Sequence, residues 1–196
     1  PWDGKLTFKI DPASASAFNV LIRIPGWAQG QAMPSDLYAF AKHVTQKIPI
    51  SINGKEVAYA IEHGYAVLSK TWKKGDVISL ELPMDVQKII SNEKVTDNIG
   101  KIALQRGPIM YCAEAPDNFG LTSNLVVPGT SLFQAEFKPE LLNGIVVLRG
   151  DAVAISVDTE KNSVTSKSQT LTAIPYYAWA HRGKGEMTVW LPQKIS

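Results

Sequence analysis

The stretch from Gly100 to Glu114 places the firmest constraint on the fold of this chain. It consists of two strand-like runs that meet at Arg106-Gly107-Pro108. Glycine next to proline is typical of a turn, because glycine accepts positive φ and proline cannot continue a strand ladder. Residues 100–114 are therefore predicted to form two β-strands joined by a turn, which makes the chain a β-protein.

Alternation of apolar and polar residues extends this prediction over the first half of the chain. The segments with this pattern are 6–10, 20–24, 48–52, 65–68 and 77–82. A period of two is typical of strands with one buried and one solvated face, as in antiparallel sheets. Asn53-Gly54 predicts a tight hairpin turn, because both residues tolerate positive φ. Gly75 is expected at the bend before the strand that starts near Val77.

The second half is predicted to repeat this design. Its further strands are expected over 133–137, 145–148, 152–157, 169–179 and 187–191. The second and third of these are interpreted as a hairpin around a Gly150-Asp151 turn. Residues 115–130, rich in Pro, Gly, Asn and Ser, are interpreted as a long loop, and 158–168 as polar and turn-like. The one helix candidate is about Ser35 to His43, with Ser35 as its cap.

The pattern as a whole favours an all-β fold with little helix. The chain has 196 residues, enough for one large domain or two of about 100. Short strands and frequent turns predict two antiparallel β-sandwich domains in series, jelly-roll-like in style. The polar segment 91–98 is the best domain boundary that the residues themselves indicate.

Charge and hydropathy indicate which classes of partner, nucleic acid or membrane, this chain is expected to lack. The formal net charge is +2 and the Lys and Arg residues are spread evenly, so we expect no nucleic-acid partner. No apolar run approaches the roughly 20 residues that span a bilayer, so we expect no membrane partner. The chain begins without Met and almost at once with a strand pattern, so we expect it to be part of a longer protein.

The sequence gives little support for a metal site or for a catalytic nucleophile. His43, His63, His181 and Cys112 show no CxxC, HxH or HExxH spacing, so no metal site and no cofactor are predicted. Asp97-Asn98 and Asp117-Asn118 leave a calcium site open, although both pairs also favour turns. Cys112 lies on a predicted strand without a nearby base, and we interpret it as a small buried hydrophobe.

Charged side chains near the predicted turns are interpreted as structural. Glu114 and Asp117 are three residues apart, but a strand-to-loop segment does not set the carboxylate separation that glycoside chemistry needs, and we interpret them as solvated acids. The basic run from Arg182 to Lys184 is interpreted as solvated loop charge. Arg106, between two apolar runs, is expected to pair with a carboxylate. No catalytic residue is predicted.

Aromatic residues offer the one binding hypothesis. Tyr176, Tyr177 and Trp179 form the densest aromatic cluster. Such rings can stack on sugar faces, which makes these three the candidate residues of a carbohydrate site. The alternative is that aromatic residues at strand ends, Trp27, Trp72 and Trp190 among them, plug the open ends of a sandwich, where their polar atoms still find partners.

Several motifs together carry a family resemblance. In chain order they are 1–4 (PWDG), 22–27 (IRIPGW), 52–55 (INGK), Trp72 with Gly75-Asp76, 103–112 (ALQRGPIMYC), 176–182 (YYAWAHR) and Trp190-Leu191. In this order they resemble the C-terminal region of glycoside hydrolase family 127, the β-L-arabinofuranosidase-like group. The resemblance covers nearly the whole chain.

The resemblance implies that the catalytic residues lie in a different domain from the one represented by this chain. Proteins of this family carry their catalytic residues on an upstream (α/α)₆ barrel, and nothing in this chain matches those residues. Residues 1–84 are then expected to be a β-sandwich that is incomplete on its N-terminal side, and residues 85–196 a C-terminal β-sandwich.

Three functions follow as hypotheses. The first is a non-catalytic region that supports the barrel or its assembly. The others are a module that binds plant-type carbohydrate and an oligomerisation domain that forms homo-oligomers. A secreted or periplasmic parent protein is an open alternative.

Overall fold

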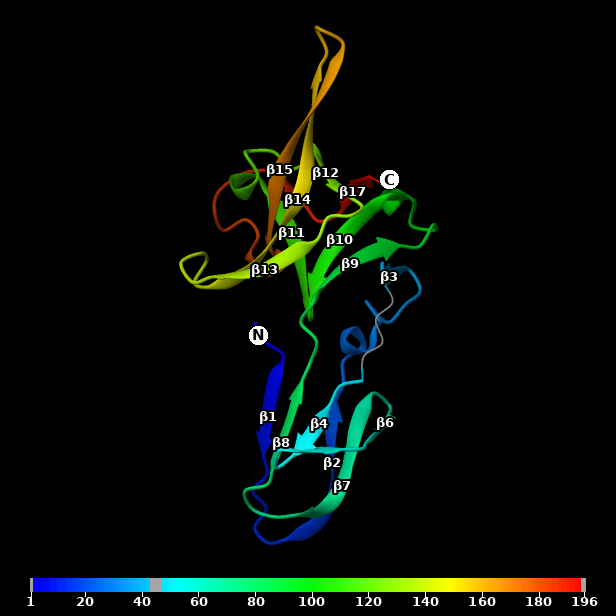
Figure 1. Cartoon of the computed structure of the whole chain (residues 1–196), viewed down its shortest axis with the longest axis vertical. Coiled ribbons are helices and arrows are strands. Elements are labelled where there is room, and N and C mark those ends of the chain that lie inside the picture. Colours follow the sequence, from blue (N-terminus) through cyan, green and yellow to red (C-terminus); the bar gives the residue numbers. More distant parts are fainter. Residues whose placement is uncertain (1, 43–46, 195–196) are drawn as a thin grey trace. The chain divides into compact units, whose positions relative to one another are not determined.

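The structure is a computed structural model that describes residues 2–42 and 47–194. These residues form β-strands joined by turns and short 3₁₀ segments, so the all-β prediction is confirmed. Among the described residues no helix is long and apolar enough to cross a membrane. Contacts divide the chain into a first unit, residues 1–34 with 43–84, and a second unit, residues 35–42 with 85–196 (Figure 1).

The first unit packs two antiparallel sheets around a shared core. One sheet has the order β1 (Lys5–Lys9), β8 (Val77–Glu81), β4 (Ile50–Ile52) and β5 (Lys55–Val57). The other has the order β2 (Ser16–Arg23), β7 (Tyr65–Trp72) and β6 (Ala60–Glu62). Inward-facing side chains of both sheets, including Ile50, Trp72 and Ile78, join one buried cluster. The apolar positions of the period-two sequence pattern are therefore the residues that face this core.

Turns of the first unit behave as their residues predict. Asn53 and Gly54 both have positive φ, 52° and 78°, and connect β4 to β5 as the predicted hairpin. Gly75 has a φ of 88° at the bend before β8. The Asn53 side chain also donates a hydrogen bond to the Asp76 carboxylate, at 2.8 Å, which ties the two turns together.

The second unit closes six strands into a ring. The ring runs β10 (Lys101–Arg106), β11 (Ile109–Glu114), β15 (Ser163–Pro175), β14 (Ile145–Asp158), β12 (Leu125–Pro128), β17 (Leu191–Lys194) and back to β10. Four more strands extend it: β9 (Val86–Ser91) and β3 (Tyr38–Phe40) beyond β10, β16 (Met187–Thr188) beside β11, and β13 (Phe133–Lys138) beside β14.

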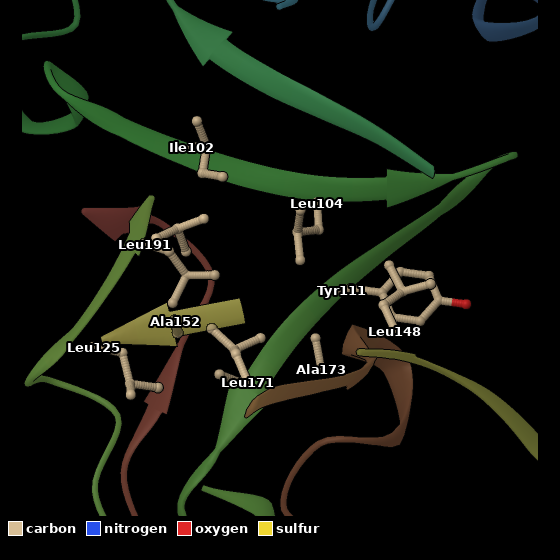
Figure 2. Close-up of a cluster of buried hydrophobic side chains, with 11 residues drawn as sticks. Ile102, Leu104, Tyr111, Leu125, Leu148, Ala152, Leu171, Ala173 and Leu191 are labelled. Atoms are coloured by element: carbon tan, nitrogen blue, oxygen red, sulfur yellow. The ribbon is translucent and has the colours of Figure 1, made fainter. Parts of the chain in front are cut away.

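The ring encloses the larger core. Figure 2 shows Ile102, Leu104, Leu125, Leu171 and other side chains from six strands meeting in its interior. Leu104 lies opposite Tyr111 in the β10–β11 register, and both point inward. The two strand-like runs of residues 100–114 are therefore confirmed as a hairpin, with Gly107 at a φ of 56° in its turn.

The predicted helix near Ser35 is wrong over the residues that the structure describes. Residues 38–40 form strand β3, which pairs with β9. The Tyr38 ring stacks on Trp190, with centroids 5.3 Å apart. Hydrogen bonds to a sheet edge and this stacking outweigh a short helical pattern, because such a short helix has little intrinsic stability. His43 lies outside the described residues.

The predicted hairpin around Gly150-Asp151 is also wrong, because β14 runs straight through it. Gly150 pairs with Phe133 on one side and with Leu171 on the other. A Cβ on Gly150 would lie 2.7 Å from the Phe133 ring and 2.8 Å from the Leu132 carbonyl oxygen. The glycine therefore permits a close approach between strands and marks no turn.

Two predicted loops contain strands. Within 115–130, β12 inserts fully buried Leu125 and Val127 into the ring. Within 158–168, residues from Ser163 onward belong to β15, which leaves a short turn next to Asn162. Beyond β15, the predicted strand over 169–179 ends at Pro175, where the 3₁₀ segment η4 (Tyr176–Ala178) begins. The sequence did not predict these strands because β12 is very short and the first part of β15 is polar and solvated.

Candidate functional site

A buried ion-pair cluster lies at the end of β11. Arg182 Nη2 is 2.5 Å from a carboxylate oxygen of Glu114 and 2.5 Å from one of Asp117, and Nη1 donates a second hydrogen bond to Asp117 at 2.7 Å. The Glu114 side chain is only 5% exposed, and the Ala180 N–H donates to it at 2.9 Å. The interpretation of these groups as solvated loop charges is therefore wrong.

The cluster holds the loop after η4 against the ring. Asp117 first, and Glu114 with it, raise the pKa of Arg182, because both carboxylates stabilise its positive charge. Asn118, which is buried, donates to the carbonyls of Glu114 and Thr172 and accepts from the Thr172 N–H. Asp117 and Asn118 thus serve the fold, and their side chains are committed to protein partners.

Cys112 is confirmed as a small buried residue. It lies on β11 with 1% exposure, and burial raises the pKa of its thiol to about 12. The thiolate is the nucleophilic form, so this sulfur is held unreactive at neutral pH.

The residues considered as metal ligands do not converge. Within residues 2–42 and 47–194, no three His, Cys, Asp or Glu side chains form a group that could hold a metal ion. His63 lies at a turn with a φ of 50°, and its carbonyl accepts a hydrogen bond from Arg23. Asp97-Asn98 belongs to the short 3₁₀ segment Thr96–Asn98.

The structure brings the three aromatic candidates together on η4 and the residue after it. Tyr176, Tyr177 and Trp179 are 45%, 61% and 42% exposed. The rings of Tyr176 and Trp179 are nearly parallel, 16° apart in plane with centroids 6.1 Å apart. They form an exposed aromatic patch, named here the η4 patch. Trp72, by contrast, is fully buried, and its Nε1 donates to the Phe18 carbonyl at 2.9 Å.

Arg106 differs from its prediction. No ion pair among the described residues includes it. Its Nε and Nη1 atoms are buried without a hydrogen-bond partner, and so is the hydroxyl of Tyr111. Sequence reasoning singled out Arg106 as a charge that needs a partner, but it missed Tyr111, whose place opposite Leu104 follows only from the register.

Comparison with models of known protein families identifies the family of this chain. The family model "Glycoside hydrolase family 127 C-terminal domain" matches residues 86–192, and "Beta-L-arabinofuranosidase, GH127 middle domain" matches residues 1–84. The chain belongs to glycoside hydrolase family 127. The resemblance that the motifs carried is thereby confirmed.

Individual members of family 127 match over almost all of this chain. A non-reducing end β-L-arabinofuranosidase of Bifidobacterium longum subsp. longum is 32% identical over 96% of this chain and 28% of its own length. The structure titled "The GH127, Beta-arabinofuranosidase, BT3674" is 40% identical with a TM-score of 0.93, covering 99% of this chain and 30% of its own.

A third relative, the structure of Ara127N-Se, a GH127 β-L-arabinofuranosidase from Geobacillus stearothermophilus T6, is 36% identical with a TM-score of 0.84. It covers 99% of this chain and 29% of its own. The chain thus spans less than a third of the length of each of these relatives.

Proposed function

We propose that this chain is the non-catalytic region that follows the catalytic domain of a family 127 glycoside hydrolase and supports that domain. One observation carries this proposal. Relatives that match nearly the whole chain extend over more than three times its length, and the matched parts are the family's middle and C-terminal domains. The remainder of such a protein therefore precedes these domains, and the bond-breaking groups are sought there.

The chemistry of the described side chains supports the same assignment. Glycoside hydrolysis by paired carboxyl groups needs one acid that holds a proton and one free carboxylate, set on either side of the sugar bond. Glu114 and Asp117 form a pair of carboxylates close in space, and Arg182 engages both. Cys112 is buried as a thiol. These groups build the fold and are not free to attack or protonate a substrate.

The proposed substrate class follows from the relatives. Two of their names state β-L-arabinofuranosidase activity and the third β-arabinofuranosidase activity, so we assign arabinofuranoside linkages of plant-type carbohydrate to the parent protein. The partner of this chain is then the upstream (α/α)₆ catalytic barrel.

A joined chain tests the supporting role. The part of the BT3674 relative that precedes its matched region would be produced alone and joined in front of Pro1 of this chain. We expect the joined chain to hydrolyse a nitrophenyl β-L-arabinofuranoside and to melt at a higher temperature than the catalytic part alone. This chain by itself should release no nitrophenol. A catalytic part equally stable and active without this chain would contradict the proposal.

Sugar binding by the η4 patch is a second candidate, favoured by the parallel and exposed rings of Tyr176 and Trp179. Calorimetric titration of this chain with arabinose-containing oligosaccharides tests it. Saturable binding should disappear in Trp179→Ala and persist in Phe119→Ala, which removes a ring that is 83% exposed elsewhere. Absence of heat with every oligosaccharide would dispose of this candidate.

Homo-oligomer formation is a third candidate, favoured by the far end of the β14–β15 hairpin. This two-stranded ribbon projects beyond the other strands of the second unit (Figure 1). Val157 and Val164 pair across it and are 66% and 69% exposed. Light scattering should show a dimer that dissociates in the Val157→Thr and Val164→Thr double variant. A monomer at high protein concentration would contradict this candidate.

A further inference from the structure

Two buried polar groups without partners lie where β10 and β11 meet. They are the guanidinium of Arg106, through Nε and Nη1, and the hydroxyl of Tyr111. Tyr111 as a whole is only 1% exposed. Buried polar groups in native proteins are almost always hydrogen-bonded, so each exception calls for an explanation.

The β10–β11 register places both groups on one side of the hairpin. Arg106 lies opposite Ile109, and Leu104 lies opposite Tyr111. Side chains two residues apart on a strand share a face, so Arg106 follows Leu104 on the inner face and stands at the mouth of the ring. In Figure 2 the Tyr111 hydroxyl points away from the labelled aliphatic side chains.

Charge and burial at this mouth act on Tyr111 together. Burial raises the pKa of Tyr111 to about 12, while the charge of Arg106 acts in the opposite direction. Arg106 lowers this pKa both by its charge and as a hydrogen-bonding neighbour of the hydroxyl, so the two groups are close, although their geometry falls short of a formed hydrogen bond. Tyr111 pairs with Pro175, the residue directly before η4, so η4 lies beside the same mouth.

The decisive feature is that two nitrogens of the Arg106 guanidinium, Nε and Nη1, are buried without an acceptor among the described residues, although the residue as a whole is only partly buried. Arginine stays protonated in proteins and offers five N–H donors in a planar fork. Buried N–H donors without an acceptor are unfavourable, and a carboxylate accepts two such donors at once. Arg182, near the other end of the same hairpin, shows the carboxylate arrangement, because both of its terminal nitrogens are paired with carboxylates, although its Nε lacks a partner in the described part of the chain.

We propose that Arg106 and Tyr111 form a receptor for a carboxylate side chain of the catalytic domain that precedes this chain, with the η4 patch packing around it. This inference rests on the proposed function. A partly buried arginine together with nearby exposed Tyr and Trp side chains is the composition of an interface hot spot. The occupant is assigned to the catalytic domain because about 70% of each relative lies outside the region matched here.

Hydrogen exchange of the joined chain tests this docking site. Amides of residues 105–112 and 176–179 should exchange at least tenfold more slowly in the joined chain than in this chain alone. Slower exchange elsewhere in the second unit, with no change at these residues, would overturn the docking site while leaving the supporting role intact. Equal exchange throughout the chain would overturn the proposed function and the docking site together.

Arg106→Met provides a second measurement that does not depend on the joined chain. In this chain alone the variant should melt at an equal temperature or a few degrees higher, because it removes two buried N–H donors that lack an acceptor. In the joined chain the added protection of residues 105–112 should be lost. Arg149→Met, which removes a half-exposed arginine of β14, should change neither result.

Two outcomes of these variants would overturn the assignment. A clear drop in the melting temperature of Arg106→Met in this chain alone would show that Arg106 is already paired within it. Saturable binding of glucuronate or galacturonate to this chain, lost in Arg106→Met and retained in Arg149→Met, would identify the receptor as a site for acidic sugars and not for a domain.

Discussion

Removing the guanidinium of Arg182 should destabilise the second unit strongly. Arg182→Met keeps the length and much of the apolar stem of the side chain but leaves Glu114 and Asp117 without their cation. The side chains of Arg182, Glu114 and Asp117 are 19%, 5% and 18% exposed, so all three lie mostly out of water. Breaking a buried ion pair by removing one partner costs about 3–5 kcal/mol.

The expected loss lies at the low end of that range. Asp117 keeps some contact with solvent, and Glu114 keeps the hydrogen bond from the Ala180 N–H. We therefore expect a loss of about 3 kcal/mol in the free energy of unfolding. With a typical urea dependence of about 2 kcal/mol per molar, the midpoint of urea unfolding should fall by about 1.5 M.

Equilibrium urea unfolding followed by circular dichroism measures this shift, and two further variants make it specific. Adding Glu114→Gln to Arg182→Met should recover at least about 1 kcal/mol, because the uncompensated carboxylate is then gone. Arg149→Met should cost less than about 0.5 kcal/mol, since its pair with Glu136 is half-exposed and 3.6 Å long. A loss below about 1 kcal/mol in Arg182→Met, or no recovery in the double variant, would refute the reasoning.

Three more results are expected from the isolated chain. Hydrogen bonds, the one from Asn53 first, lower the pKa of Asp76 to about 2, so its carboxylate stabilises the first unit above pH 4. Asp76→Asn should therefore lower the urea midpoint at pH 7, by a margin that closes as the pH falls from about 4 to below 2. Cys112, with its pKa raised to about 12, should react with a thiol reagent at pH 8 only as fast as the second unit unfolds. Trp72→Ala should destabilise the first unit by about 3–5 kcal/mol, seen as a lost unfolding transition in calorimetry.

Strands whose signal is local were predictable from the sequence. Asn53-Gly54 defines its own hairpin, because the turn depends on the conformations that these two residues tolerate. Gly150 misled the prediction because the reason for this glycine lies in Phe133, a residue on a neighbouring strand. β12 was missed because Leu125 and Val127 are too short a pattern to stand out among turn-forming neighbours. Only closure of the ring, a long-range property, makes that segment a strand.

The candidate site was less predictable than the fold. Arg182 and Glu114 are 68 positions apart, and no local sequence pattern near either residue indicates that the two side chains pair. Local sequence classed both as solvated because charged residues beside turns usually are. Arg106 was recognised as a charge in apolar surroundings. Its lack of a carboxylate partner among the described residues depends on where the carboxylates lie in the folded structure, which the local sequence does not determine.

The β10–β11 hairpin thus carries two arginine environments whose contrast has a functional meaning. Near Glu114, at the end of β11, the chain itself provides two carboxylates for the terminal nitrogens of Arg182 and a backbone donor for Glu114, so this cluster serves stability. At the mouth beside Tyr111, the described residues provide a charge, a phenol and exposed rings but no acceptor for Nε and Nη1 of Arg106. This open end, with two buried Arg106 nitrogens and the Tyr111 hydroxyl unpartnered within the described chain, is where we propose that the catalytic domain docks on its supporting region.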